Sequence, residues 1–457
     1  MNVDHVREQN FDGVWGKRLR GVSTDSRMVK QGDVFFAIRG NRFDGHTFVR
    51  EAFSRGCIAA VVEESFAHEN SLEPGAPLLF VKDSVKALGG FARWYRRKFD
   101  VPLIAVTGSN GKTTTKEMVA AVLSEKFTVL KTEGNLNNHI GVPMTLFRLE
   151  KKHQAAVIEM GTNHFGEIEY LCSVAEPTHG LITNIGRAHL EFFGDVEGVA
   201  KAKGELFEWL GSHGLGFVNA DDPLVLEKSK RLRKKFTYGL TGKRVNVKGR
   251  FLGLNRWVQP RFSVGGHPLP RPFSVQLRTC GTYAAENALA AAAVGIHFGV
   301  NARKIKSALE SFRARSKRME VLKVQGVTIL NDTYNANPDS VLAALKTLAL
   351  MECKGKKIVV LGDMLELGEV SEREHRSIGR EIQSLQLEYV LTYGSDASVI
   401  VAESHVPYAF HFEEKSMLIA HLEELVAPGD IVLVKGSRGM KMEDVVVHLT
   451  EHVRARK

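Results

Sequence analysis

Residues 101–123 read VPLIAVTGSNGKTTTKEMVAAVL, and this stretch gives the clearest indication of the fold. Its apolar start predicts a buried strand, and TTKEMVAAVL predicts a helix that begins directly after a glycine-rich turn. The glycines let several N–H groups face one anion, and the helix N-terminus adds partial positive charge. The lysine of such a loop reaches the outer phosphates, and the hydroxyl after it binds magnesium. The predicted nucleotide-phosphate loop consists of Gly108, Ser109, Asn110, Gly111, Lys112, Thr113 and Thr114.

A ligand-free structural turn is the alternative interpretation, and the order strand, loop, helix makes it the weaker one. The loop lacks the first glycine of the common GxxxxGK[ST] pattern. Its compact form, TGSNGKT, is typical of a narrower group of nucleotide-binding proteins.

The composition is that of an ordinary globular protein, with 457 residues, 44% hydrophobic and 25% charged. At roughly 150 residues per domain, about three domains are expected. The first ten residues, MNVDHVREQN, have no apolar core, so we expect no signal peptide. The longest apolar run, residues 288–300, is too short to span a bilayer of about 30 Å.

The four cysteines are far apart and form no CxxC pair. We therefore expect reduced thiols and a cytoplasmic location.

The net charge of +10 allows either a nucleic-acid partner or a polyanionic small molecule. The basic residues are dispersed, and no zinc-finger spacing or RNA-binding aromatic signature accompanies them. Phosphate-bearing substrates are therefore favoured over nucleic acid.

The order of apolar runs predicts an α/β protein of three domains. Residues 57–62 and 77–81 read as strands of a small α/β domain, which a basic helix ends near residue 100. The central runs LIAVTG, FTVLKT, AAVIEMG and GLITNIG each precede a helical pattern, so a mostly parallel sheet is expected. Residues 236–280 read as an antiparallel or irregular insertion. Four later runs predict a Rossmann-like, doubly wound domain: VTILND, KIVVLGD, YVLTYG and DIVLVKG. The expected domains are 1–100, 101–313 and 314–457, with a two-substrate site in a cleft between domains.

Two strands after the phosphate loop end in possible metal ligands. Glu159 closes the run AAVIEMG, and His189 follows GLITNIG. Either residue alone would read as structural, but both lie at the carboxyl end of the same predicted sheet as the loop. We therefore expect them to bind magnesium.

Residues 196–210, VEGVAKAKGELFEWL, predict a helix whose two lysines face opposite ways. The apolar face contains Val199, Lys203, Leu206, Phe207 and Leu210. The opposite face, laced with ion pairs, contains Glu197, Lys201, Glu205 and Glu208. An inward ammonium is costly, so Lys203 snorkels, pairs with a carboxylate or is chemically altered. Carbamylation by carbon dioxide would create an anionic ligand for a second magnesium, whereas an ion pair with Glu159 is the plainer interpretation.

Together these motifs resemble the Mur ligases, and the resemblance spans nearly the whole chain. The motifs that carry it are STDSR (23–27), GDVFFAIRG (32–40), DGHTF (44–48), GNLNNHIGVP (134–143), EMGTNHFGEI (159–168), NDTYNANPDS (331–340), GDMLELG (362–368) and VKGSRGMKME (434–443). Within the family, NDTYNANP and EMGTNH are similar to the member that adds D-alanyl-D-alanine to UDP-N-acetylmuramoyl-tripeptide. The chain departs from the family pattern at Tyr283-Ala284, where His-Asn is common, and at Phe165, where Pro is common.

The resemblance implies roles for individual residues. Glu159 and Thr113 would hold one magnesium ion, and His189 with carbamylated Lys203 would hold the other, with Lys112 completing the catalytic set. Asn287 would contact the adenine of ATP, Arg318 its terminal phosphate and Asp332 its ribose. Tyr334 and Asn337 would lie nearby. The uridine-nucleotide substrate would contact Ser23, Asp25, Ser26, Arg27, Asp44 and His46, and the central signatures contribute Asn135, Asn137, Asn138, Thr162 and Asn163. For the carboxylate of the incoming dipeptide, the candidates are Lys435, Ser437 and Arg438, because they follow a predicted strand and include cations.

The predicted reaction activates a carboxylate as an acyl phosphate, which an amine then attacks. Three alternatives remain: another Mur-type ligase that adds a single amino acid or glutamates, a phosphate-loop nucleic-acid motor, and a non-catalytic binding module. A motor is disfavoured because strand-tracking aromatic residues and an arginine finger are not evident. We expect a monomer. The sequence does not predict the identity of the third residue of the tripeptide.

Overall fold

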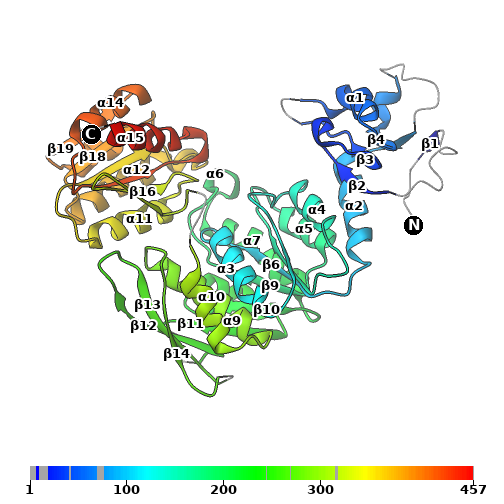
Figure 1. Cartoon of the computed structure of the whole chain (residues 1–457), viewed down its shortest axis with the longest axis horizontal. Coiled ribbons are helices and arrows are strands. Elements are labelled where there is room, and N and C mark those ends of the chain that lie inside the picture. Colours follow the sequence, from blue (N-terminus) through cyan, green and yellow to red (C-terminus); the bar gives the residue numbers. More distant parts are fainter. Residues whose placement is uncertain are drawn as a thin grey trace.

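The computed structural model describes residues 7–9, 19–40, 43–68, 77–242, 244–267, 269–313 and 317–455. Three sheets follow one another along the chain, as predicted, and each forms the centre of an α/β unit (Figure 1). The N-terminal and C-terminal units lie on opposite sides of the central unit in Figure 1. We call them the N-terminal, central and C-terminal units below.

The N-terminal unit is a five-stranded sheet of order β1-β5-β4-β3-β2, in which β1 alone is antiparallel. Its elements are β1 Arg7–Gln9, β2 Gly21–Ser23, β3 Asp33–Phe36, α1 Val49–Ser54, β4 Ala59–Glu63, β5 Leu78–Val81 and α2 Ser84–Arg96. The two strands predicted here are confirmed as β4 and β5. The basic helix is α2, which begins at the capping carboxylate of Asp83 and packs against α4 and α5 of the central unit.

The central unit is a nine-stranded sheet of order β14-β13-β12-β11-β10-β9-β6-β8-β7. Its strands are β6 Leu103–Thr107, β7 Val129–Lys131, β8 Ala155–Glu159, β9 His179–Ile182, β10 Leu215–Asn219, β11 Lys234–Gly239, β12 Val247–Leu254, β13 Pro260–Gly265 and β14 Phe273–Gln276. Its helices are α3 Lys112–Ser124, α4 Gly141–Leu146, α5 Glu167–Ala175, α6 Leu190–Phe193, α7 Val196–Leu210, α8 Pro223–Lys228, α9 Tyr283–His297 and α10 Ala302–Ser311.

Residues 236–280 are antiparallel in part, as predicted, because the β12–β13 and β13–β14 pairs are antiparallel. The segment is not a separate insertion, however, because β11 and β12 continue the parallel sheet beyond β10. The alternating pattern of this segment is that of strands with one face exposed, and such strands occur at the margin of a parallel sheet as well as in a separate hairpin. Helices α3, α9 and α10 pack together over one face of the sheet, and α5 and α7 pack together in the other main apolar core.

The C-terminal unit is a six-stranded sheet of order β15-β16-β20-β17-β18-β19, parallel except for β15. Its elements are β15 Glu320–Val324, β16 Val327–Asp332, α11 Pro338–Leu350, β17 Lys357–Gly362, α12 Ser371–Ser384, β18 Tyr389–Tyr393, α13 Ser398–Ser404, β19 Tyr408–Phe412, α14 Lys415–Leu425, β20 Ile431–Lys435 and α15 Glu443–Ala455. All four predicted strands are present, and the doubly wound arrangement is confirmed. Among the described residues, no helix is long and apolar enough to cross a bilayer. The four cysteines carry free thiols, as expected.

Candidate active site

The phosphate loop joins β6 to α3, as predicted, and the end of β9 holds it in place. Gly111 precedes the first turn of α3 with φ 76°, and Gly108 has φ 143°. A Cβ atom at Gly108 would lie 1.9 Å from the hydroxyl of Thr183, so only glycine fits there. The Thr183 hydroxyl and the Asn184 amide donate to the Asn110 carbonyl at 2.6 and 3.0 Å. The loop is therefore held in one conformation by its neighbouring strand.

Lys112 points back along the loop that precedes it. Its Nζ donates to the carbonyl oxygens of Gly108 and Ser109 at 2.6 and 3.2 Å. Burial lowers the Lys112 pKa, Glu159 raises it and Arg318 lowers it, and together they bring it to about 8. An anionic phosphate in the loop would stabilise the ammonium form, because it places negative charge beside a cation that hydrogen-bonds to two neutral carbonyls.

Glu159 ends β8 and is 1% exposed. Its Oε1 accepts hydrogen bonds from the Thr113 hydroxyl at 3.1 Å and from the Asn137 amide at 2.9 Å. Its Oε2 has no hydrogen-bond partner among the described residues, and the ammonium of Lys116 lies 3.9 Å away. A buried carboxylate oxygen without a partner is costly in isolation and suits a bound cation. The residues present therefore fit a magnesium ion beside the loop.

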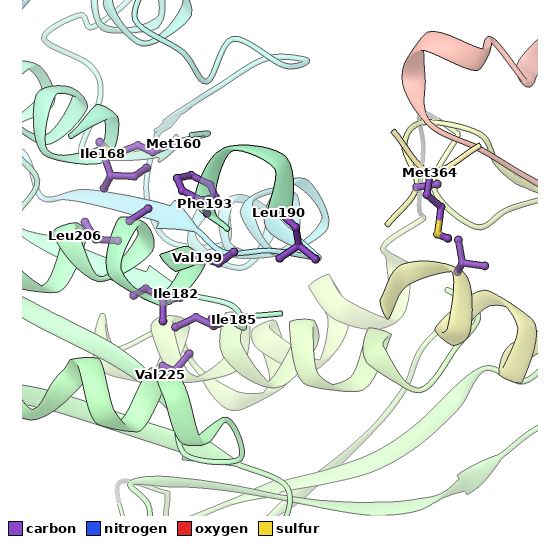
Figure 2. Packing of buried hydrophobic residues seen from close by; sticks show 14 of the residues in the cluster. Met160, Ile168, Ile182, Ile185, Leu190, Phe193, Val199, Leu206, Val225 and Met364 are labelled. Atoms are coloured by element: carbon purple, nitrogen blue, oxygen red, sulfur yellow. The ribbon is translucent and has the colours of Figure 1, made fainter. Parts of the chain in front are cut away.

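The predicted faces of α7 are confirmed for its two lysines. Lys203 is 1% exposed, whereas Lys201 is exposed to solvent. Val199 and Leu206, from the same face as Lys203, belong to the core that also contains Ile182 of β9 (Figure 2). The helical period alone therefore predicted the burial of Lys203.

Burial holds the pKa of Lys203 well below its ordinary value, and the nearby charge of Lys112 lowers it further. The ion pair with Glu159 is absent, and among the described residues no carboxylate pairs with Lys203 at all. Glu205 was placed wrongly on the ion-paired solvent face. Its half-buried carboxylate accepts from the backbone N–H groups of Gly166 and Glu169, 2.7 and 3.0 Å away, at the start of α5. The carboxylate of Glu205 therefore binds the N–H groups at a helix N-terminus, which favours negative charge, and does not form a surface ion pair.

His189 precedes α6 in the left-handed region, with φ 55°. Its Nδ1 lies 2.5 Å from Oε2 of Glu366, which comes from the C-terminal unit, and the contact lowers the pKa of Glu366. A carboxylate on one ring nitrogen is the usual partner of a histidine whose other nitrogen binds a metal. Across the described residues, no three His, Cys, Asp or Glu side chains gather as a metal site. A metal here would need hydroxyl ligands or a modified lysine.

The C-terminal unit contributes an aromatic-cation pair and a buried ion pair. The Arg318 guanidinium stacks 3.7 Å from the Tyr334 ring centre, and its buried Nε has no partner among the described residues. Asp332 accepts from Lys435 Nζ at 2.6 Å, and this ammonium also donates to the Asn335 carbonyl at 2.9 Å. Lys435 is only 2% exposed, and its ammonium stabilises the end of β16 through these two hydrogen bonds.

A cleft of about 840 Å³ brings most predicted residues together. Residues of all three units line it. The predicted residues among them are Ser109, Asn110, Gly111, Lys112, Thr114, Asn137, Asn138, Glu159, Thr162, Asn163, His189, Asn287, Arg318, Asp332, Tyr334, Asn337 and Lys435. The predicted residues outside the lining are Gly108, Thr113, Asn135, Lys203, Ser437, Arg438 and the six assigned to the uridine nucleotide.

The residues assigned to the uridine nucleotide lie in two turns of the N-terminal unit. Asp25 caps the turn Ser26–Met28 and pairs with Arg27 at 2.7 Å. His46 is 4% exposed and uses both ring nitrogens, one with Asp44 at 2.6 Å and one accepting from the Glu63 backbone N–H at 2.9 Å. The side chain of His46 therefore supports its turn and has no free polar atom for a ligand.

The contacts between the central and C-terminal units were not predicted from the sequence. Arg187 donates to Asp339 and Glu374, and Glu366 contacts His189. Arg187 stands two residues before His189, and Asp339 follows Asn337 at a helix start. Their positions beside predicted site residues were the available signal, but the sequence does not show which charges meet across two units.

Three family models match successive parts of the chain. They are described as Mur ligase family, catalytic domain (residues 18–96), Mur ligase middle domain (residues 106–295) and Mur ligase, glutamate ligase domain (residues 317–438). The chain is 38% identical to the UDP-N-acetylmuramoyl-tripeptide–D-alanyl-D-alanine ligase of Escherichia coli, covering 95% of this chain and 94% of that one. It is 37% identical to the ligase of the same name from Bacillus subtilis, covering 95% and 93%.

Solved structures agree over nearly the full length. A MurF structure from Acinetobacter baumannii superposes with a TM-score of 0.86 at 33% identity, covering 95% of this chain and 94% of that chain. A MurF ligase from Thermotoga maritima in complex with ADP gives 0.85 at 29% identity, covering 96% and 99%. Family models that match successive parts of the chain, and relatives over 30% identical along almost its whole length, show that the chain belongs to the Mur ligase family.

Proposed function

We propose that this enzyme uses ATP to join D-alanyl-D-alanine to UDP-N-acetylmuramoyl-tripeptide, which gives the pentapeptide precursor of peptidoglycan, ADP and phosphate. Relatives over 30% identical carry this activity in their names and align over almost the whole chain. The observation that carries the proposal is the cleft itself. It places a phosphate loop, a buried carboxylate with one oxygen that accepts no hydrogen bond from the described residues, and side chains of two flanking units around one space.

The proposed reaction has two steps. A carboxylate oxygen of the tripeptide attacks the γ-phosphorus of ATP, the bond to the β-γ bridging oxygen breaks, and ADP leaves. The dipeptide amine then attacks the acyl carbon, loses a proton to solvent or phosphate, and expels phosphate. Lys112 is positioned to neutralise charge on the transferred group, because its ammonium sits at the mouth of the loop.

Magnesium would be held by Glu159 and Thr113 at one position and by His189 and Lys203 at another, and it would supply charge neutralisation on the phosphates. The proposal includes carbamylation of Lys203. That reaction forms a bond between Nζ and the carbon of carbon dioxide with loss of a proton, and it requires a neutral amine. Burial favours the neutral amine of Lys203.

The proposed nucleotide contacts come from the central and C-terminal units, and the proposed dipeptide contacts come from the C-terminal unit. Asn287 would contact adenine, Asp332 ribose and Arg318 the terminal phosphate, with Tyr334 and Asn337 alongside. Among the three candidates for the dipeptide carboxylate, Arg438 is the exposed cation. Lys435 and Ser437 would orient the strand end, because Lys435 pairs with Asp332 and Ser437 accepts from the Leu365 backbone N–H at 2.8 Å.

The three units serve as domains in this proposal. Residues 1–100 would bind the uridine nucleotide through the turns around Asp25 and Asp44. Residues 101–313 would bind ATP, and residues 314–457 would close over ATP and bind the dipeptide. The enzyme would act as a monomer in the cytoplasm, and no nucleic acid takes part.

The test compares amine substrates. Purified enzyme with ATP, magnesium and UDP-N-acetylmuramoyl-tripeptide should form ADP rapidly with D-alanyl-D-alanine and slowly without an amine. Lysine, diaminopimelate and glutamate serve as competing amines, with the UDP-dipeptide and UDP-tripeptide acceptors in parallel. Preference for a single amino acid would refute the dipeptide assignment and favour another Mur-type ligase. Rapid ADP formation with no acceptor would favour a simple ATPase.

A further inference from the structure

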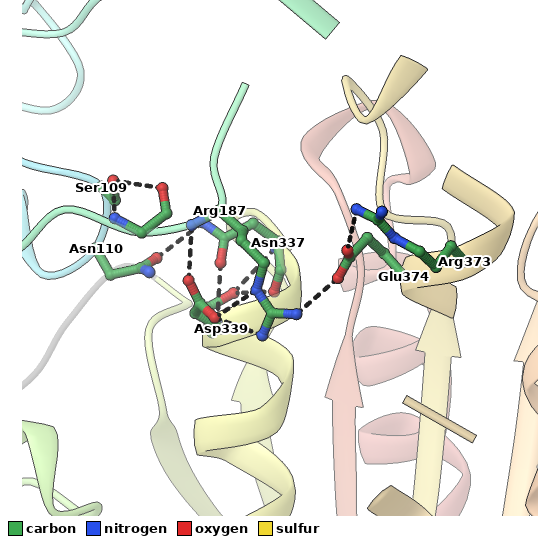
Figure 3. Close-up of polar contacts among 9 residues, drawn as sticks. Ser109, Asn110, Arg187, Asn337, Asp339, Arg373 and Glu374 are labelled. Atoms are coloured by element: carbon green, nitrogen blue, oxygen red, sulfur yellow. Dashed lines mark hydrogen bonds and ion pairs between the residues drawn. The ribbon is translucent and has the colours of Figure 1, made fainter. Parts of the chain in front are cut away.

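Arg187 reaches from the loop after β9 into the C-terminal unit (Figure 3). Its Nε and Nη2 donate to Oδ1 of Asp339 at 2.9 and 2.6 Å, and its backbone N–H donates to Oδ2 of the same carboxylate at 2.7 Å. Its Nη1 donates to Oε2 of Glu374 at 2.7 Å. One guanidinium therefore joins two helices, α11 and α12, of the other unit.

The carboxylate of Asp339 is placed to receive this contact. Asp339 lies in the first turn of α11, where the helix dipole stabilises negative charge. A Cβ atom at position 186 would lie 2.4 Å from its Oδ2, so Gly186 permits the close approach of the two units. The side chains of Arg187 and Asp339 are 31% and 28% exposed, so water screens this pair only in part.

The same turn of α11 contacts the phosphate loop. The Asn337 amide donates to Oδ1 of Asn110 at 2.9 Å, while its own Oδ1 caps α11. Gly186, next to Arg187, donates through its N–H to the Ser109 hydroxyl at 2.9 Å and accepts from it at 3.0 Å. The phosphate loop and the start of α11 are therefore linked by two short paths of hydrogen bonds.

We propose that Arg187 is a positioning residue that docks the C-terminal unit on the phosphate loop through Asp339, and so presents Arg318 to the terminal phosphate beside Lys112. Strand β16 leads through residues 333–337 into α11, so the place of α11 sets the place of the residues near Asp332 and Arg318. The inference rests on the role proposed above for Arg318.

The contacts of Arg187 allow a clean substitution. Across the described residues, every hydrogen bond of its guanidinium goes to the C-terminal unit, so truncation leaves the internal contacts of the central unit in place. Arg373 offers a matched control. It donates to the same Glu374 at 3.1 Å, but both residues belong to α12, so this contact joins no units.

The test is a double-mutant cycle of Arg187→Ala and Asp339→Ala, read as kcat at saturating substrates and as the radius of gyration by small-angle X-ray scattering with ADP bound. We expect each single variant to lose kcat about tenfold, the double variant to lose no more than either single, and Arg373→Ala to stay within about twofold. The single and double variants should also be more extended than the wild type with ADP.

Two results would overturn the proposal: single variants with wild-type kcat and radius of gyration, or multiplicative losses of about a hundredfold in the double variant. Arg318→Ala separates this proposal from the role of Arg318. If that variant keeps full kcat, the role of Arg318 is wrong, while the radius of gyration of Arg187→Ala still decides whether Arg187 docks the unit.

Discussion

Replacing Lys203 with methionine should remove activity and yet raise stability. In the absence of carbon dioxide and magnesium, the side chain is a buried amine, 1% exposed and without a carboxylate partner among the described residues. Replacing a buried ion pair with apolar residues of similar volume is often neutral or stabilises a protein by about 1 to 4 kcal/mol, and the same cost of burying an ionisable group applies to Lys203. For a protein of this size, each kcal/mol corresponds to about 2–4 °C in melting temperature or somewhat less.

The sign of the pH dependence follows from the lowered pKa of Lys203. Between that folded-state pKa and the unfolded value of about 10.4, the unfolded chain carries a proton that the folded chain lacks. The wild type therefore loses about 1.4 kcal/mol of stability for each unit by which the pH falls through this window. Below the folded-state pKa both states are protonated, and the loss stops growing. Lys203→Met lacks this contribution.

The assay is urea unfolding of both proteins from pH 7 to 10 in magnesium-free buffer purged of carbon dioxide, with ligation measured separately in complete buffer. The stability advantage of the variant should grow as the pH falls. Lys201→Met, on the solvent face of the same helix, is the matched control and should change neither quantity. A variant less stable than the wild type at every pH would refute the burial argument, and a variant that ligates at the wild-type rate would refute a role for Lys203.

Three further changes have defined outcomes. Gly111→Ala should weaken ADP binding in a fluorescent-nucleotide titration, because φ is 76° and the new Cβ would lie 2.5 Å from Asn287 Oδ1. The control is Gly134→Ala, where φ is 53° and the space around the new Cβ is open, and this variant should keep ADP binding. Thr115→Val should raise the KM for ATP by about two- to tenfold, since the lost hydroxyl donates to Asn287 Oδ1 at 3.1 Å, and Thr115→Ser should restore it; unchanged KM in the valine variant would contradict this positioning role. Burial lowers the pKa of His179 to about 4, so its folded state stays neutral while the unfolded state is protonated near pH 6.5. As the pH falls from about 6.5 to about 4, the free energy of unfolding should therefore fall by up to about 3 kcal/mol. The free energy of unfolding of His179→Phe, measured with urea, should depend less steeply on pH. Equal slopes for the wild type and the variant would contradict this prediction.

Local patterns predicted much of this protein. The strand-loop-helix order around Gly111 placed the nucleotide loop, because the glycines and the helix start impose that geometry on neighbouring residues. The 3.6-residue period of α7 turned Lys203 inward, since a continuous apolar face must be buried whatever the rest of the fold is. Apolar runs located ten of the strands, although several begin or end one to four residues from the expected bounds.

Contacts between distant segments were decided by the tertiary structure. The sequence showed Lys435 and Asp332 as separate ligand candidates, yet β16 and β20 lie side by side and their ends form a buried ion pair. Glu205 shares a helix face with surface charges, but α5 begins beside it, and backbone N–H groups of its first turn donate to the carboxylate. Likewise, β11 pairs with the free edge of β10 and β12 pairs with β11, so both strands extend the parallel sheet.

Local sequence patterns were therefore sufficient to predict ten of the strands, the nucleotide loop and the inward lysine, because these depend on residues within a few positions of one another. The tertiary structure decided which charges meet. Arg187 and Asp339 are 152 positions apart, and nothing in the periodicity of either segment indicates the other. Only the packing of two units brings them to hydrogen-bond distance, where partial burial makes the pairing strong enough to set the geometry of the cleft.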